Sequence, residues 1–496
     1  MLARGRLTIA LGLGCLGLAV WTALAGVGSD ASAEPQPSAS LPEVGAFGPE
    51  SADEPAAEVD PFEPALPQPP VPSTAPSAVP AESPAAKPFR SAKGVVPPDV
   101  LSRVPVPLPT VGAAGLPRLV AGRESGARSS RGERVSELVS PAGSRSKLRI
   151  DYTLDLELTR AIYDIFERGR VSLGLAVVLD PATGNVIAYA GTNPKRLPPG
   201  EVYPAASLVK VVTAAAALEN VPGVAGRTCR YVGNPYRLTA ARVVPPKGGI
   251  EVSLERALAM SNNQCFAQLA VNDLGAKRML DAIRRFGLLE RPGRGHEAGQ
   301  AADPHGDRYA LGKLGCGLAG LQITALHAAE IAATLVDGKR REARWIERVT
   351  DANGELLALP KARPPVQVLT PALATRLRDL MVATTESGTA RRAFHASYGR
   401  PILKAMNVAA KTGSLSGTTP PGRYEWFIGL APADRPKVAI AVLVVQPKRW
   451  HTTGSQVGAQ VLNAIFCRAS VCRPDRADQW LTAELESPAS SAATPN

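Results

Sequence analysis

Ser207 and Lys210 are the two residues of this 496-residue chain whose spacing most directly suggests covalent chemistry. The apolar residues 211–218 follow them and predict a buried helix, with Pro204 at its start, where a missing N–H is tolerated. Residues three apart lie on one face of a helix, so the hydroxyl and the amine would be neighbours. An amine can take the hydroxyl proton, and the free N–H groups of a helix start can stabilise an oxyanion. The pattern therefore indicates an activated serine nucleophile.

Two further clusters strengthen this interpretation, which is weak alone because Ser144 and Lys147 repeat the same spacing. Ser261 and Asn263 lie at a predicted bend near a helix, whereas residues 411–414, Lys-Thr-Gly-Ser, end a predicted strand. Each cluster also has a purely structural interpretation: a serine at a bend can cap a helix, and a lysine can occupy a solvated strand end. The ordered set Ser-x-x-Lys, Ser-x-Asn and Lys-Thr-Gly favours catalysis.

The N-terminal residues predict export. Arg4 and Arg6 precede a nearly continuous apolar run over residues 7–27, and about 20 apolar residues span a bilayer. The positive flank keeps the N-terminus cytoplasmic, which places the remainder of the chain outside. Residues 31–33, Ala-Ser-Ala, form a small-x-small cleavage site. Residues 1–33 are therefore expected to be a signal peptide or, as we prefer, an anchor in the inner (cytoplasmic) membrane.

Two segments have the composition of disordered chain. Residues 34–146 are rich in Pro, Ala, Ser and Gly, and they bury too little apolar surface to offset the entropy lost on ordering. We expect a flexible tether there, which would hold a folded domain on the order of 60 Å from a membrane. Residues 476–496 are again small and polar, and they predict a disordered tail.

A single α+β domain is expected over residues 147–475. A strand followed by an amphipathic helix is predicted over residues 151–168, and a β-hairpin that turns at residues 180–184 comes next. Hydrophobic periodicity predicts further helices over residues 254–287 (broken near 274–275), 321–336, 372–385 and 455–467, and strands around 408–413, 426–430 and 437–445. The last strand is apolar enough to be central. Strands near both ends, with helices between them, predict a mainly antiparallel central sheet covered by helices.

Charge and cysteine content limit the kinds of partner and cofactor that we expect. The net charge of +12 is spread along the chain without a basic stripe containing aromatic residues, so nucleic-acid binding is not expected. An oxidising compartment permits disulfides, and Cys467 with Cys472 is the pair closest in sequence. Cys265 and Cys316 are interpreted as small buried apolar residues. No Cys-x-x-Cys pair or His cluster indicates zinc, and neither a metal nor a cofactor is expected.

The three motifs, in this order and with these separations, resemble the penicillin-binding protein transpeptidase family within the serine D,D-peptidase and β-lactamase superfamily. The resemblance extends over residues 148–470 and includes the Asp-Pro-Ala-Thr-Gly turn at 180–184 and Glu-Trp-Phe-Ile-Gly at 425–429. It implies a transpeptidase fold with a helical subdomain, peptidoglycan stem peptides as substrates and β-lactams as inhibitors. It also makes cell-wall synthesis proteins candidate partners.

The resemblance implies a role for each motif residue. Ser207 would attack a stem-peptide carbonyl next to the terminal D-alanine and form an acyl-enzyme, with Lys210 as its base. Ser261 would relay the proton to the leaving amine. Asn263 would bind the acyl-side amide, and Lys411 would hold Ser261 and attract the substrate carboxylate.

The end of the third motif would complete the binding site. Thr412 and Ser414 would donate hydroxyl hydrogen bonds, Gly413 would belong to the same substrate-binding strand, and the backbone N–H groups of Ser207 and Ser414 would form the oxyanion hole. The predicted function is a D,D-transpeptidase that cross-links stem peptides in the periplasm or another extracytoplasmic space. A D,D-carboxypeptidase, a serine β-lactamase and a noncatalytic penicillin-binding sensor or scaffold stay open as alternatives.

Overall fold

The computed structural model describes residues 96, 101, 108–109, 134–139, 147–395, 402–403, 406–446, 452–469 and 471–481. The predicted signal peptide or anchor, the decoy serine Ser144, most of the predicted tether and the last 15 residues of the predicted tail lie outside these residues. Among the described residues, every helix is too short or too polar to span a bilayer.

A five-stranded antiparallel sheet lies at the centre of the folded region, in the strand order β14-β15-β16-β3-β4. Its strands are β3 (Gly174–Leu179), β4 (Val186–Gly191), β14 (Ala409–Thr418), β15 (Pro421–Ala431) and β16 (Val438–Gln446). Every residue of β3, β4 and β16 is buried, because helices cover both faces of this part of the sheet. The predicted hairpin and the central position of the strand over 437–445 are confirmed.

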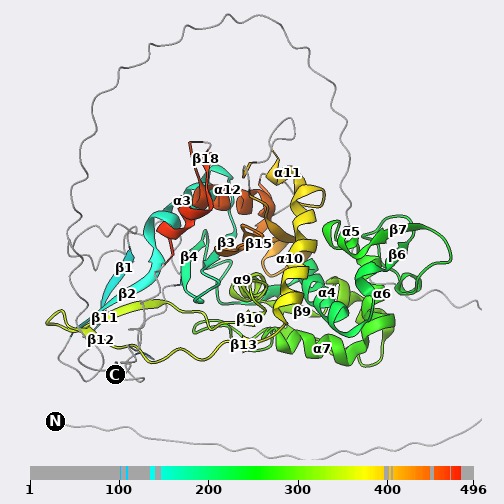
Figure 1. The fold of residues 1–496 in the computed structure, drawn as a ribbon, viewed down its shortest axis with the longest axis horizontal. Coiled ribbons are helices and arrows are strands. Elements are labelled where there is room, and N and C mark those ends of the chain that lie inside the picture. Colours follow the sequence, from blue (N-terminus) through cyan, green and yellow to red (C-terminus); the bar gives the residue numbers. More distant parts are fainter. Residues whose placement is uncertain are drawn as a thin grey trace, which may run out of the picture. The chain divides into compact units, whose positions relative to one another are not determined.

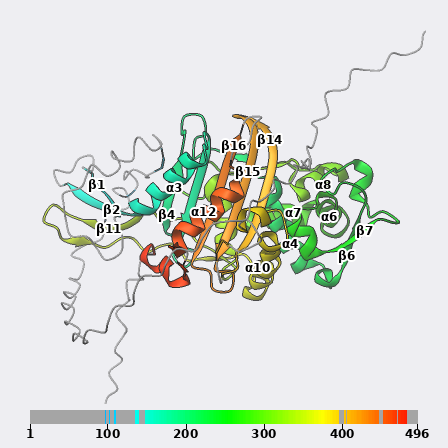
Figure 2. The same cartoon turned by 90° about the horizontal axis from the view of Figure 1, so that it is seen from above.

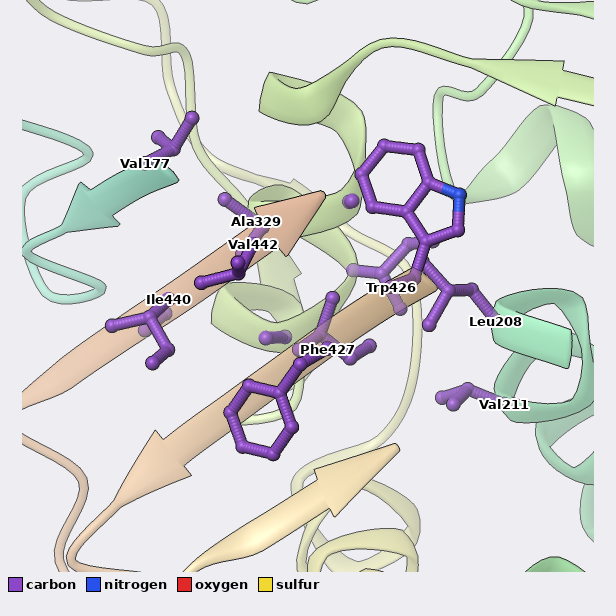
Figure 3. Close-up of a cluster of buried hydrophobic side chains, with 14 of the residues drawn as sticks. Val177, Leu208, Val211, Ala329, Trp426, Phe427, Ile440 and Val442 are labelled. Atoms are coloured by element: carbon purple, nitrogen blue, oxygen red, sulfur yellow. The ribbon is translucent and has the colours of Figure 1, made fainter. Parts of the chain in front are cut away.

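Helices pack on both faces of the sheet. The helices α3 (Leu156–Arg168) and α12 (Gly454–Phe466) contact each other, and α12 lies across β15 and β16 (Figure 2). The apolar helix α9 (Ala325–Thr334) contacts β3, β15 and β16. Adjacent residues of β15 point to opposite faces, with Trp426 towards Leu208 and Phe427 away from it (Figure 3). This arrangement confirms the predicted α+β fold with a helix-covered sheet.

A group of helices carries the first two motifs and lies beside β14 (Figure 2). Its helices are α4 (Val209–Asn220), α5 (Leu254–Ala259), α6 (Asn263–Gln268), α7 (Gly275–Arg285) and α8 (Arg308–Cys316), with a π-helical turn at Leu269–Leu274 between α6 and α7. Four of these helices, α4 to α7, are labelled in Figure 1. Gly275 has φ +75°, which favours glycine and interrupts the helix where a break was predicted. The helix α10 (Pro371–Glu386) packs against α5 and β14.

The shorter elements connect these parts. They are β5 (Tyr203–Pro204), β6 (Thr228–Tyr231), β7 (Ile250–Ser253), β8 (Gln300–Ala301), β9 (Leu321–Ile323), β10 (Lys339–Arg340), β13 (Val366–Gln367), α11 (Arg391–Phe394), β17 (Cys467–Arg468) and β18 (Val471–Cys472), with 3₁₀ turns at Ala206–Leu208, Val224–Gly226, Ala240–Val243 and Pro474–Gln479.

Two predictions near α9 and α4 are wrong in detail. The helix predicted over 321–336 begins only at Ala325, because Thr324 caps it and residues 321–323 pair instead as β9 with β5. Pro204 belongs to β5 rather than to the helix start, since its segment pairs with β9 and a 3₁₀ turn precedes α4.

Both predicted boundaries of the domain need correction. The strand β1 (Arg134–Val139), placed in the predicted tether, pairs with β2 (Leu148–Asp155) in a second sheet that also contains β11 (Ile346–Thr350) and β12 (Leu356–Leu357). Pairing with the edge of β2 supplies hydrogen-bond partners that composition alone does not reveal. At the other end, Trp480 is buried and its Nε1 donates to Ile465 O at 3.3 Å, so ordered structure continues past residue 475.

Two disulfides join elements of the described region. Cys467 and Cys472, the pair closest in sequence, are bonded. Cys229 of β6 and Cys265 of α6 form the other bond. Cys265 is buried as interpreted, but it is a disulfide partner and not merely a small apolar core residue. Cys316 is a buried free thiol, which confirms its structural interpretation.

Candidate active site

The segment that carries Ser207 is held between two glycines and the central sheet. Trp426 Nε1 donates to Pro204 O at 2.8 Å, which fixes the approach of the segment to β15. A Cβ on Gly317, whose φ is +81°, would lie 2.0 Å from Ala206 O, and a Cβ on Gly413 would lie 3.3 Å from Ser207 N. Ser207 thus occupies the 3₁₀ turn that runs into α4, where the first N–H groups have no intrahelical partner.

Lys210 is fully buried beneath Ser207. Its Nζ lies 2.7 Å from Ser207 Oγ, 2.7 Å from Asn263 Oδ1 and 2.6 Å from Cys316 O. Burial lowers the pKa of Lys210 to about 8, because desolvation disfavours the charged amine. The neutral amine that the sequence predicted as the base is therefore accessible near physiological pH.

Ser261 and Lys411 form a second hydroxyl–amine pair. Lys411 Nζ donates to Ser261 Oγ at 3.0 Å and to Thr412 O at 2.7 Å. Burial, and then the charge of Lys210, hold the pKa of Lys411 well below its usual value. Ser261 does not cap α6: Asn262 Oδ1 accepts from Cys265 N, while Ser261 has φ +57° in the bend before the helix. The capping interpretation of Ser261 is therefore wrong.

Asn263 joins the Ser207–Lys210 pair to the loop that follows β6. Its Oδ1 accepts from Lys210, its Nδ2 donates to Tyr236 O at 2.7 Å, and its backbone N–H donates to Pro235 O at 2.9 Å. Gln264 adds hydrogen bonds from Nε2 to Val232 O and Asn234 O of the same loop. Sequence reasoning missed this loop, because its contribution is made by backbone carbonyls, which no motif records.

The Lys-Thr-Gly-Ser motif lies near the start of β14 and not at its end. The strand continues to Thr418, which pairs with Pro421 of β15. The predicted strand end is wrong because the hairpin with β15 extends the pairing beyond the motif. The smallness of Gly413 brings this edge strand close to the backbone of Ser207.

Two polar partners of the motif were not predicted. Thr389, which follows α10, lies 2.5 Å from Thr412 between the two Oγ1 atoms. Arg423 Nε donates to Ser414 Oγ at 2.7 Å and lies 3.4 Å from a carboxylate oxygen of Glu425. Arg423 could have been found only by pairing the strands predicted around 408–413 and 426–430, and Thr389 comes from a turn without a sequence signal.

The structure brings all eight predicted site residues together. Hydrogen bonds connect Ser207, Lys210 and Asn263 in one group and Lys411 with Ser261 in another, and the charge of Lys210 acts on Lys411. The strand residues Thr412, Gly413 and Ser414 line the edge beside Ser207. A serine next to an amine of lowered pKa, with a second hydroxyl as proton carrier and backbone N–H groups nearby, is suited to acyl transfer.

Comparisons with known proteins agree with this chemistry. Residues 174–467 match the model of the family described as the penicillin binding protein transpeptidase domain. The peptidoglycan D,D-transpeptidase PbpA of Mycobacterium tuberculosis is 28% identical over 372 residues, which cover 64% of this chain and 71% of that protein. The peptidoglycan D,D-transpeptidase FtsI of Escherichia coli K12 is 26% identical over 367 residues, covering 67% of this chain and 57% of FtsI.

Solved structures of penicillin-binding proteins also resemble the fold of this chain. The crystal structure of PBPA from M. tuberculosis superposes with a TM-score of 0.53 at 25% identity, covering 64% of this chain and 81% of that one. Its penicillin G acyl-enzyme complex superposes with a TM-score of 0.51 at 26% identity, covering 64% and 80%.

Proposed function

Because the chain belongs to the penicillin-binding protein transpeptidase family, we propose that Ser207 is the nucleophile through which it forms its acyl-enzyme. The protein is a serine-type peptidoglycan D,D-transpeptidase that binds β-lactams and acts outside the cytoplasm. The observation that carries the assignment of Ser207 is the 2.7 Å contact between its Oγ and the buried Lys210 amine.

Acylation begins with the neutral Lys210. The amine takes the Ser207 proton as Oγ bonds to the stem-peptide carbonyl next to the terminal D-alanine. The N–H groups of Ser207 and Ser414 receive the developing oxyanion, and each such donor typically contributes about 3 kcal/mol. The C–N bond then breaks, and the proton passes by way of Ser261 to the leaving D-alanine amine.

Binding groups orient the substrate for this step. Asn263 receives the amide on the acyl side, and Lys411 with Thr412 and Ser414 receives the terminal carboxylate. The amine of a neighbouring stem peptide then attacks the ester carbonyl, which forms the cross-link and returns the proton to Ser207. A β-lactam ring opens on the same serine and leaves it acylated.

The parts outside the catalytic domain complete the proposal. Residues 1–33 anchor the chain in the cytoplasmic membrane, and the Pro-rich segment before β1 carries the domain away from it. Cell-wall synthesis proteins are the proposed partners of that segment. The folded transpeptidase unit extends from residue 134 to residue 481, as supported by β1 and by the buried Trp480.

Labelling with a fluorescent penicillin tests the nucleophile. Wild type and the matched control Ser144→Ala should label equally, and Ser207→Ala should not label at all, because no other hydroxyl contacts Lys210 among the described residues. Labelling of Ser207→Ala would overturn the assignment.

Turnover separates the reactions open to this site. Stem peptide with an added amine acceptor should yield a cross-linked product. Hydrolysis alone would indicate a carboxypeptidase, and release of the penicillin label within minutes would indicate a β-lactamase. Stable labelling without any peptide product would indicate a sensor.

A further inference from the structure

We propose that Thr389 is a positioning residue, whose hydroxyl donates to Thr412 and so leaves the Thr412 proton for the substrate carboxylate. This inference rests on the proposed role of Thr412 in carboxylate binding. Thr389 Oγ1 and Thr412 Oγ1 are 2.5 Å apart, a distance at which one hydroxyl must donate and the other accept.

The backbone holds Thr389 in place from several directions. Its N–H donates to Ala259 O at 3.1 Å, two residues before Ser261. A Cβ on the preceding Gly388 would lie 2.4 Å from the same carbonyl oxygen, so the approach requires glycine. Arg256 Nη1 donates to Ser387 O at 3.0 Å and secures the turn to α5. Thr389 is therefore placed by α5, the helix that ends two residues before Ser261.

The strand that carries Thr412, β14, is held by α10, the helix that precedes Thr389. Thr385, in the last turn of α10, donates from Oγ1 to Val408 O at 2.9 Å, just before β14 begins. The end of α10 is thereby joined both to α5 and to the strand that carries Lys411 and Thr412. Thr389 and Thr412 meet where these elements converge.

The chemistry of two hydroxyls decides the direction of the bond. A hydroxyl has one proton, so Thr412 cannot give its proton to Thr389 and to a carboxylate at the same time. When Thr389 donates, Thr412 accepts with a lone pair and keeps its proton for the carboxylate. A chain of hydroxyls oriented in one direction also polarises its members, which strengthens the final hydrogen bond to the anion.

The test compares a penicillin with its carboxyl methyl ester in the full chain. Thr389→Val should lower the second-order acylation rate constant for the free acid by about 3- to 10-fold, the range of one hydrogen bond, and leave the ester unchanged. Thr389→Ala should show the same change in the acid-to-ester ratio, and Thr389→Ser should restore it. Thr418→Val, on the same strand opposite Pro421, is the matched control and should alter neither rate.

The measurements distinguish failure of the positioning role of Thr389 from failure of the proposed function on which it rests. Equal losses for acid and ester in Thr389→Val, or no loss for the acid, would overturn the positioning role while leaving Ser207 as the nucleophile. Absence of acylation in the wild type would overturn the proposed function and this inference with it. Thermal unfolding of each variant establishes that the rates are measured on folded protein.

Discussion

Lys210 and Lys411 are each 0% exposed, and their hydrogen-bond partners in the described part of the chain are neutral hydroxyl, amide and carbonyl oxygens. Two ammonium groups without a carboxylate to balance them are costly in a dry site. A proton on one lysine therefore lowers the pKa of the other. In the proposed mechanism, a bound substrate carboxylate would favour the proton on Lys411, and Lys210 would stay neutral to act as the base.

The pH dependence of acylation follows from the pKa of about 8 for Lys210. In the proposed mechanism the active form of Lys210 is the neutral amine, so the acylation rate should rise about tenfold per pH unit below 8 and level off above it. Rates with fluorescent penicillin between pH 6 and pH 9 measure this, with melting temperatures as the control for folding. A rate that stays flat from pH 6 to pH 9 contradicts Lys210 as the titrating base.

At the residue scale, sequence reasoning found the groups that motifs specify. The three motifs identified Ser207, Ser261 and Lys411 with their neighbours, because each needs a particular side chain at a particular spacing. Thr389 and the carbonyl of Tyr236 could not be predicted from the sequence, because the place of Thr389 depends on how a turn packs and Tyr236 contributes only a backbone atom.

Among the elements, the β6–β7 hairpin holds the Ser-x-Asn motif through a disulfide and through the loop between its two strands. The Cys229–Cys265 disulfide fastens β6 to α6 two residues beyond Asn263. Gln268 Nε2 also donates to Arg230 O at 3.1 Å on the same strand. The hairpin is therefore attached, by this disulfide and this hydrogen bond, to the helix that contains Asn263.

Loss of this disulfide should weaken the attachment of the β6–β7 hairpin to α6 and destabilise the domain. The double variant Cys229→Ser/Cys265→Ser opens a loop with a sequence separation of 36 and should lower the free energy of unfolding by about 2–4 kcal/mol. Denaturant unfolding measures the change. The matched control is Cys467→Ser/Cys472→Ser, whose separation of 5 predicts a smaller loss. Equal losses in the two variants would contradict the argument from loop length.

Elements were predicted well where periodicity was long and poorly where pairing was distant. The helix α10 and the strand β16 were placed within a residue or two by hydrophobic pattern. The strand β9 was merged into a helix because three residues carry no period of their own, and only pairing with β5 makes them a strand. Local pattern contains no information about such partners.

For the whole molecule, the two corrected boundaries define a larger folded unit than composition suggested. Both β1 and the segment around Trp480 lie in stretches of polar or small residues. Their order comes from contacts with the domain: β1 pairs with β2, and Trp480 packs beside α12. Composition underestimates such segments, because a single strand or one tryptophan supplies the contacts that order them.

Trp480 should contribute to the stability of the whole domain. Trp480→Ala should lower the free energy of unfolding by about 3 kcal/mol, since the side chain is 7% exposed and leaves a cavity. The acylation rate of the folded variant should stay at the wild-type value. Val471→Ala, at a position 56% exposed, is the control and should change stability by less than about 0.5 kcal/mol. If the stability of Trp480→Ala is unchanged, the segment around Trp480 does not contribute to the fold, and the predicted domain end at residue 475 is the better one.

The place of β16 in the sheet has a consequence for biosynthesis. This strand lies between β3, near the start of the domain, and β15, near its end. Until residues 438–446 have been made, the hairpin β14–β15 that carries Lys411 has no pairing to the strands before Ser207. Contacts between such distant parts of a chain form late in folding. A nascent chain is therefore without transpeptidase activity, and insensitive to penicillin, until its last long strand has been synthesised and inserted.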